Sequence, residues 1–456
     1  MVPNMNSDKI TSLVFRATTD QWSCLFKYWQ TCLLLPLFVW LAGGGTVAAD
    51  PTNRSFEMVP AKISMKPAPV STAELQKWYT SQLLGDYERA GRKDTKWDAS
   101  AKAALQIVAD LKAEVTNTTP ALSAQLDRHL QSALNAGCSD PVVRCFHQQF
   151  ANVAPLWPVA EQVDRMSRIA REVEEGSHSE LVKFLVITRA IMNADRANRE
   201  LRDTNLWNQT FLWQHVAATH LRHCLEDPDF PSQEALRAVG EFLDSYEPRK
   251  SDLFLYHPVI FKPVFDYWPT NVQARCLEGA YYVSEAWAAR GTRPAAQVPA
   301  ANFKLLAQHL QRAKSALMQA WQLDPKNPEA PTRMITVMRG LDSERTEMEI
   351  WFRRAMHCDP NNYSACRRKL SYLDPRWNGS EKDLLEFGHA CVTSTNWGGQ
   401  VPLILADAHK AIQVVLFNLE PARSGYWLRP GVWTDVKASF ERFFQLTELS
   451  ITASHL

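Results

Sequence analysis

The chain has 456 residues, enough for one long helical array or for two to three domains of ordinary size. Its 50 Lys and Arg residues almost balance its 49 Asp and Glu residues. The overall charge therefore argues against a nucleic-acid-binding protein or one that binds anionic membranes, because both need a basic face. A hydrophobic content of 46% with 22% charged residues is typical of a globular protein with a full core.

The first stretch with a clear pattern is residues 1–49. A short apolar run, Thr31–Ala42, follows the basic residues Arg16 and Lys27 and precedes three glycines and small residues that end at Ala49. This order is typical of a secretory signal peptide, and the run is shorter than the ~20 apolar residues of a transmembrane helix. The sequence thus predicts a protein that is secreted or periplasmic, in the cell envelope. The alternative is that the apolar segment stays uncleaved and anchors the chain to a membrane.

Residues 50–70 are rich in Pro, Ser and Lys and lack periodicity, which predicts a disordered linker. Ser71 and Glu74 have the spacing of a capping box, so the first ordered helix is predicted to begin there. The N-terminal helical region is predicted to span residues 71–243, because apolar residues recur there at three-and-four spacing. This spacing is clearest in three segments: 101–115, 121–134 and 179–202.

The amino-acid composition changes over residues 244–271, where many aromatic residues are interspersed with four prolines. Proline interrupts regular helices, so this segment is predicted to be an irregular connector. Its apolar side chains must be covered, because large exposed apolar patches are rare on a monomer. We expect it either to be buried or to form a lid over the helices that follow.

Residues 272–456 contain an internal repeat. The stretch ALMQAWQLDPKNPEA (316–330) recurs as WFRRAMHCDPNNYSA (351–365), with every equivalent position 35 residues apart. Each copy predicts a helix, an Asp-Pro turn and a second helix, because proline ends one helix and can begin the next. A fainter third copy keeps only the pair of a bulky and a small residue. The two series of equivalent positions are Leu317, Phe352 and Phe387, and Ala320, Ala355 and Ala390.

This pattern resembles the tetratricopeptide (TPR) repeat, which has a period of about 34 residues and a terminal proline. The block from Tyr372 to His409 also looks like the end of the TPR-like region in a family of uncharacterised bacterial proteins. The resemblance implies an all-α fold in which an irregular helical region precedes a helix-turn-helix α-solenoid array. It also implies a binding scaffold without catalytic residues. The positions that carry the TPR resemblance are Ala313, Leu317, Ala320 and Pro325, and Phe352, Ala355 and Pro360.

Basic residues on the first helices of the repeats are the candidate binding residues. In stacked helical pairs the first helices line a groove, and their side chains contact the partner. We expect them to hold an acidic segment of a protein or peptide, although each could simply be a solvated surface residue. The candidates are Arg333, Arg339, Arg367, Arg368 and Lys369.

The helix predicted over His215–Cys224 carries the main candidate for metal chemistry. His220 lies three residues before His223 and four before Cys224, so two side chains on one helical face could meet a metal ion. The simpler interpretation is an amphipathic helix without a metal. A metal-dependent hydrolase that uses this helix is therefore an alternative to the scaffold, as is a purely structural cell-envelope protein.

Other enzymatic signals are weak. The sequence lacks the nucleophile elbow, the phosphate-binding glycine loop and the dinucleotide fingerprint, and we predict neither catalysis nor a cofactor. His389, Cys391, Asp407 and His409 could form a thiolate nucleophile with its base. Packing is the simpler role for them, because residues two apart on a helix face different directions.

Two pairs of cysteines are close enough in the sequence to suggest disulfide bonds in an exported protein. Cys138 and Cys145 flank one Asp-Pro turn, and Cys358 and Cys366 flank another. The second pair joins the end of one predicted helix to the start of the next. Both bonds are hypotheses that depend on the predicted export.

Overall fold

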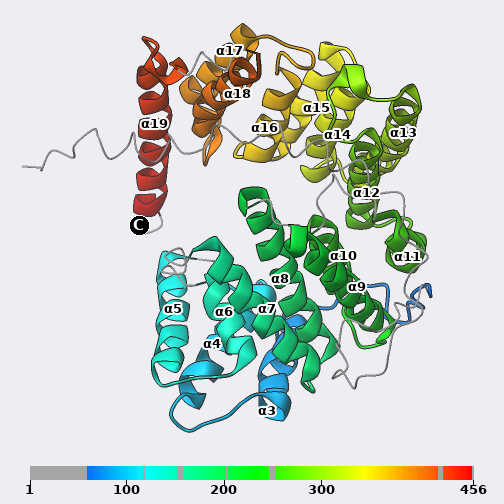
Figure 1. Cartoon of the computed structure of the whole chain (residues 1–456), viewed down its shortest axis with the longest axis vertical. Helices are drawn as coiled ribbons and strands as arrows, with labels where there is room; N and C mark the ends of the chain where they lie inside the picture. The colour runs from blue at the N-terminus through cyan, green and yellow to red at the C-terminus, as the bar shows by residue number, and fades with distance from the viewer. Residues whose placement is uncertain are drawn as a thin grey trace, which may run out of the picture. The chain divides into compact units, whose positions relative to one another are not determined.

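The computed structural model describes residues 59–116, 119–150, 158–201, 204–245, 253–419 and 425–453 (Figure 1). Within these ranges the chain forms helices and turns and contains no strand, which confirms the all-α prediction. No helix in the described ranges is both long and apolar enough to cross a membrane. The signal peptide predicted for residues 1–49 lies outside them.

The N-terminal helical region begins at the predicted capping box. The Ser71 hydroxyl accepts a hydrogen bond from the Glu74 amide, and the Glu74 carboxylate accepts one from the Ser71 amide at 2.9 Å. Pro120 is the first residue of the helix that Thr119 caps, as its missing N–H allows. The helices are α2 (Thr72–Thr80), α3 (Asp86–Ala90), α4 (Asp98–Lys112), α5 (Pro120–Asn135), α6 (Pro141–Phe150), α7 (Val159–Glu175), α8 (Glu180–Leu201), α9 (Thr204–Glu226) and α10 (Ser232–Asp244).

Residues 59–70 are not the free linker that the sequence predicts. Met65 is buried, and its carbonyl accepts a hydrogen bond from the Tyr267 hydroxyl at 2.6 Å. The Ala61 amide donates to the Val259 carbonyl, and the Trp268 indole donates to the Pro67 carbonyl. The prediction fails here because scattered apolar residues and backbone hydrogen bonds hold an extended segment without any periodic pattern.

The segment predicted as an irregular connector is helical in its described part. It forms two short turns, Leu253–Tyr256 and His257–Phe261, followed by α11 (Lys262–Tyr267). Most of its aromatic side chains lie in the first hydrophobic core, where Phe261 packs 4.7 Å from the ring of Tyr281 in α12, while Phe254 is 54% exposed. The segment is therefore largely buried and is not a lid. Prolines at the first turns of helices are compatible with this geometry.

The repeat region forms the helices that its Asp-Pro turns predict. Asp324 ends α13 and Asp359 ends α15, and each turn is followed by a new helix. Gly291, with a φ of +73°, ends α12 as expected for a C-terminal glycine. The helices are α12 (Val272–Arg290), α13 (Ala300–Leu323), α14 (Glu329–Gly340), α15 (Arg345–Cys358), α16 (Tyr363–Tyr372), α17 (Glu381–Thr393), α18 (Ile404–Leu419) and α19 (Val432–Ala453).

Successive helix pairs of this region touch one another. α14 packs against α12 on one side and α16 on the other, and α16 packs against α18 (Figure 1). The repeated alanines Ala320 and Ala355 are fully buried, and the rings of Phe352 and Phe387 meet edge to face at 5.5 Å. These contacts form a second hydrophobic core, to which α12 also contributes.

Two apolar residues of the repeat region lie outside the core. Phe303, in the first turn of α13, is 39% exposed. Ala390, the third member of the small-residue series, is also exposed. The close helix contact in α17 is made at Gly388, where a Cβ would lie 2.9 Å from the Cα of Leu405 in α18. The third copy is therefore offset from the first two.

α19 carries a set of exposed aromatic side chains. Its inner face is fixed by Ser439, whose hydroxyl donates to the Pro402 carbonyl at 2.7 Å. Trp433, Phe440 and Phe444 are 71%, 43% and 55% exposed. These three side chains lie on one exposed face of the helix, because they are spaced seven and four residues apart.

Candidate functional site: an arginine-lined groove

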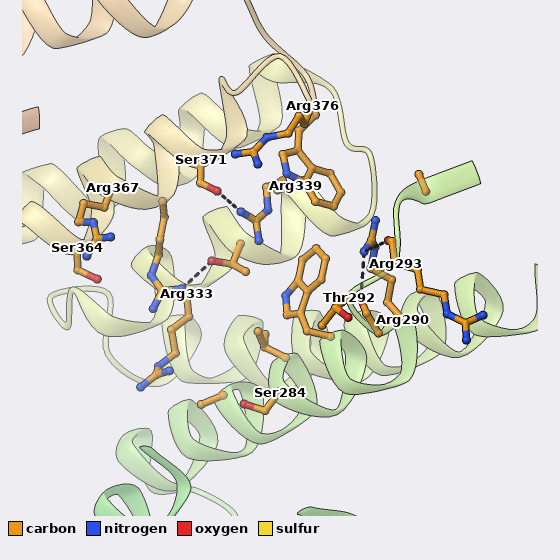
Figure 2. Close-up of a pocket in the computed structure, with 18 of the residues that line it drawn as sticks. Ser284, Arg290, Thr292, Arg293, Arg333, Arg339, Ser364, Arg367, Ser371 and Arg376 are labelled. Atoms are coloured by element: carbon orange, nitrogen blue, oxygen red, sulfur yellow. Dashed lines mark hydrogen bonds between the residues drawn. The ribbon is translucent and has the colours of Figure 1, made fainter. Parts of the chain in front are cut away.

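A groove of about 1440 Å³ lies between α12, α14 and α16 (Figure 2). The segment from Gly291 to Ala295 and the turn at Arg376 and Trp377 complete its walls. We call it the arginine groove, because seven arginines and no carboxylate side chain are among the described residues that line it. They are Arg290, Arg293, Arg333, Arg339, Arg367, Arg368 and Arg376.

These arginines differ in how their charge is balanced. Arg376 is paired with Asp374, and Arg333 with Glu329 one helical turn away. Arg367 is largely exposed and lies 3.9 Å from Asp407. Arg339 and Arg368 form no salt bridge within the described part of the chain. Arg339 instead donates to the Ser371 hydroxyl, and Arg368 to the Thr336 hydroxyl at 2.6 Å.

Two tryptophans hold Arg339 in place. Its guanidinium carbon lies 4.7 Å from the ring centroid of Trp287 and 5.0 Å from that of Trp377. The two indole rings meet edge to face at 5.5 Å, and the guanidinium carbon of Arg290 lies 5.7 Å from the ring centroid of Trp377. Such cation–π contacts orient a guanidinium without neutralising it. The positive charge therefore remains available to an anion.

Several buried donors in the groove lack an acceptor. The Nε atoms of Arg290, Arg339 and Arg368 and the indole nitrogen of Trp287 have no hydrogen-bond partner among the described residues. Buried polar groups are normally satisfied, and leaving one unpaired costs about 1–3 kcal/mol. These four nitrogens are themselves almost inaccessible, so they add to the energetic cost of the cluster in the free protein.

Burial and repulsion between neighbouring arginines disfavour the charged form of Arg339 and Arg368 in the free protein. Burial lowers the pKa of Arg339 to about 10, and the charge of Arg368 lowers it further. Burial likewise lowers the pKa of Arg368 to about 10, with a smaller lowering by Arg333 that the nearby carboxylates of Asp244 and Glu329 oppose. Both side chains still carry their charge at neutral pH. An anion in the groove would relieve this electrostatic penalty.

The groove contains four of the five basic residues that the sequence singles out. Arg333 and Arg339 reach it from α14, and Arg367 and Arg368 reach it from α16. Lys369 does not line it. Its ammonium pairs with Glu349 at 2.8 Å and lies over the rings of Phe352 and Phe387. Residues two apart on a helix point about 200° apart, so Lys369 faces away from Arg367.

The other groove residues are not apparent from the repeat pattern. Trp287 and Arg290 lie in the last turns of α12 and Arg293 just beyond its end, whereas Arg376 and Trp377 follow the Asp-Pro pair at 374–375. These residues belong to two segments more than 80 residues apart in the sequence, so only tertiary packing brings them together. The one sequence signal was the high number of tryptophans, sixteen in the chain.

The thiolate site considered for the C-terminal helices does not form. His389 and His409 both approach Asp435, with their Nε2 atoms 3.3 and 3.1 Å from its Oδ2. Asp407 accepts a hydrogen bond from Tyr363 instead. Cys391 is fully buried. The cluster lacks the contact between thiol and imidazole that a thiolate nucleophile needs.

Neither proposed disulfide bond is present. All seven cysteines in the described residues are free. The Cys358 thiol donates to the Pro325 carbonyl, whereas Cys366 lies in the core against Met356. Cys138 and Cys145 are both buried, and burial raises the pKa of their thiols to about 11 and 12. These cysteines act as packing residues.

The histidine helix divides into two parts. His215 contacts the Tyr256 hydroxyl at 3.0 Å, and Cys224 is buried in the first core. His220 and His223 instead converge on Glu180, the first residue of α8. Of the two pairs that the helical spacing predicts, His220 with Cys224 and His220 with His223, only the second meets. Glu180 is a third side chain that the spacing does not reveal.

In comparisons with known proteins, no protein-family model and no curated protein matches the chain.

Proposed function

We propose that the protein is a non-catalytic scaffold that binds an acidic segment of a protein or peptide partner in the arginine groove. In this proposal the helical pairs of residues 272–456 are TPR-like units of an α-solenoid, and their first helices form the binding surface. Successive contacts of α12, α14, α16 and α18 support that arrangement. The signal-peptide pattern of residues 1–49 supports an exported location, with an uncleaved membrane anchor as the alternative.

The two partly buried guanidiniums that form no salt bridge within the described residues carry this proposal. Arg339 and Arg368 are desolvated, positively charged and unpaired by any acidic side chain in the described residues. A charge-assisted hydrogen bond from arginine to a carboxylate is among the strongest that proteins use, and it is often bidentate. Aspartate and glutamate side chains of a partner are suited to these donors.

The size of the groove favours a segment of chain over a single ion. A volume of about 1440 Å³ exceeds the roughly 300–1,000 Å³ of pockets that take one small molecule. The arginines are also spread over three helices and two turns, so a single anion cannot reach them all. An extended acidic peptide can place successive carboxylates against successive guanidiniums.

Calorimetric titration of the full chain with a short peptide rich in Asp and Glu tests the proposal. We expect saturable binding that weakens as salt is raised, because part of the attraction is between exposed charges. The same peptide with Asn and Gln in place of Asp and Glu should bind at least about 10-fold more weakly. A tenfold loss of affinity requires the loss of only about 1.4 kcal/mol of binding free energy.

Charge reversal at the edge of the groove should weaken peptide binding by at least about 10-fold. The variant Arg293→Glu with Arg367→Glu changes two exposed residues, so the fold should survive. Arg353→Glu, an exposed residue of α15 outside the groove, is the matched control and should bind normally. Equal affinity of all three proteins would refute the site. Binding of inorganic phosphate with no binding of the peptide would show that the groove takes a different ligand.

A further inference from the structure

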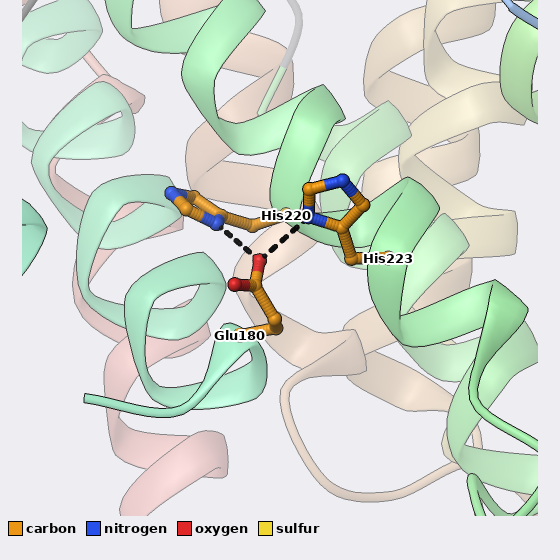
Figure 3. Close-up of side chains that lie close together, drawn as sticks. All are labelled: Glu180, His220 and His223. Atoms are coloured by element: carbon orange, nitrogen blue, oxygen red, sulfur yellow. Dashed lines mark hydrogen bonds and ion pairs between the residues drawn. The ribbon is translucent and has the colours of Figure 1, made fainter. Parts of the chain in front are cut away.

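Three side chains far from the arginine groove converge at one point between α8 and α9 (Figure 3). Glu180 begins α8, and His220 and His223 share one face of α9 because they lie three residues apart. The Glu180 Oε2 atom lies 2.6 Å from Nδ1 of His220 and 3.0 Å from Nδ1 of His223. One carboxylate oxygen and two imidazole nitrogens therefore face each other.

A fourth residue orients the buried histidine. Glu174, near the end of α7, places its Oε2 atom 2.6 Å from Nε2 of His220, and both side chains are almost fully buried. This contact fixes the imidazole ring with Nδ1 turned toward Glu180. A carboxylate on the far nitrogen of a ligating histidine is the usual outer partner in metal sites, where it raises the basicity of the ligand.

We propose that Glu180, His220 and His223 form a binding site for a divalent transition-metal ion of the zinc type. Two histidines and one glutamate are a ligand set that zinc uses when it keeps an open coordination position. The side chains of Glu180 and His223 are 44% and 40% exposed, so an ion can reach the site and retain bound water. The inference is independent of the function proposed for the groove.

The geometry requires only a small adjustment. Ligands at about 2.1 Å in a tetrahedral site lie about 3.4 Å apart, compared with the 2.6 and 3.0 Å between the oxygen and the two nitrogens. Opening the three side chains by less than about 1 Å makes room for the ion. His223 and Glu180 are exposed enough to move, whereas Glu174 holds His220 in place.

Arg222 opposes metal binding and provides a second test. Its guanidinium donates to Nε2 of His223 at 3.1 Å. When Nδ1 of His223 binds a metal, the proton of the neutral ring lies on Nε2, which can no longer accept that hydrogen bond. Arg222 then keeps only its pair with Glu226 at 3.1 Å. The variant Arg222→Gln should therefore bind the metal more tightly than the wild type.

Zinc titration of the chelator-treated full chain tests the site. We expect one ion per chain, with affinity at least 10-fold weaker in His223→Gln and in Glu180→Gln. Glu174→Gln should weaken binding by about 10–100-fold through the orientation of His220. His357→Gln, an exposed histidine of α15, is the control and should bind normally.

The cobalt spectrum separates this site from the thiols of the chain. Nitrogen and oxygen ligands give visible d–d bands without the near-ultraviolet charge-transfer band of a cobalt thiolate. Absence of saturable zinc binding to folded wild-type protein, or binding that His223→Gln leaves unchanged, would overturn the proposal. A thiolate band would do the same. Far-ultraviolet circular dichroism of each variant confirms that the fold is intact.

Discussion

Replacing Leu317 with Ala should lower the free energy of unfolding by about 2–5 kcal/mol, the usual effect of emptying a buried leucine site. Leu317 is fully buried at the contact between α13 and α12. That contact is close because Gly279 of α12 has no side chain. A Cβ at Gly279 would lie 2.5 Å from Cγ of Leu317. Urea unfolding of the full chain measures the effect.

A double-mutant cycle makes this test specific to the helix contact. Gly279→Ala alone should destabilise the protein, because overpacking costs about 1–3 kcal/mol and the gain in helix propensity is only about 1 kcal/mol. Combined with Leu317→Ala, the same change should become neutral or stabilising. Additive effects would show that the two helices do not meet in this register. Leu323→Ala, 44% exposed on the same helix, should change stability by less than about 0.5 kcal/mol.

Replacing Arg339 with Met should reduce affinity for the acidic peptide about 30-fold or more. Loss of one member of a buried charge pair commonly costs about 2–5 kcal/mol of binding. The stability of the free protein should stay the same or rise. The variant loses cation–π contacts with Trp287 and Trp377, which are worth about 0.5–2 kcal/mol. It also removes a desolvated charge that the neighbouring Arg368 repels.

Lys369→Met is the matched control for this prediction and should behave in the opposite way. Lys369 is paired with Glu349 and lies outside the groove. Its replacement should therefore lower the melting temperature while peptide affinity is retained. A normal affinity of Arg339→Met for the peptide would exclude the buried arginine as a binding residue. Calorimetric titration and thermal melts of both variants provide the comparison.

Local signals in the sequence predict the elements of the repeat region well. The Asp-Pro turns after α13 and α15 and the glycine after α12 act through the backbone of a few neighbouring residues. The same reasoning fails for residues 59–70. The position of this segment is fixed by hydrogen bonds to residues about 200 positions away, such as Tyr267 and Trp268. A local sequence pattern cannot predict contacts with partners so distant in the chain.

The sites were partly predictable for the same reason. Four groove arginines lie on the first helices of the repeats, where a stacked arrangement predicts a binding surface. The near-zero net charge of the chain gives no sign that arginines gather in one groove. The 50 basic and 49 acidic residues balance in total but are distributed unevenly in space. Glu180 lies 40 residues from His220, and only the packing of α8 against α9 makes it a neighbour. The helical spacing of His220 and His223 gave two of the three proposed ligands.

The central claim is that the arginine groove holds an acidic segment, and photo-cross-linking tests it most directly. A peptide rich in Asp and Glu that carries a photoreactive group would be bound to the full chain, irradiated and mapped by mass spectrometry. We expect cross-links to residues 284–295 and 363–377, suppressed by an excess of unlabelled peptide. Saturable cross-links to the exposed aromatic residues of α19, Trp433, Phe440 and Phe444, with none in the groove, would contradict it.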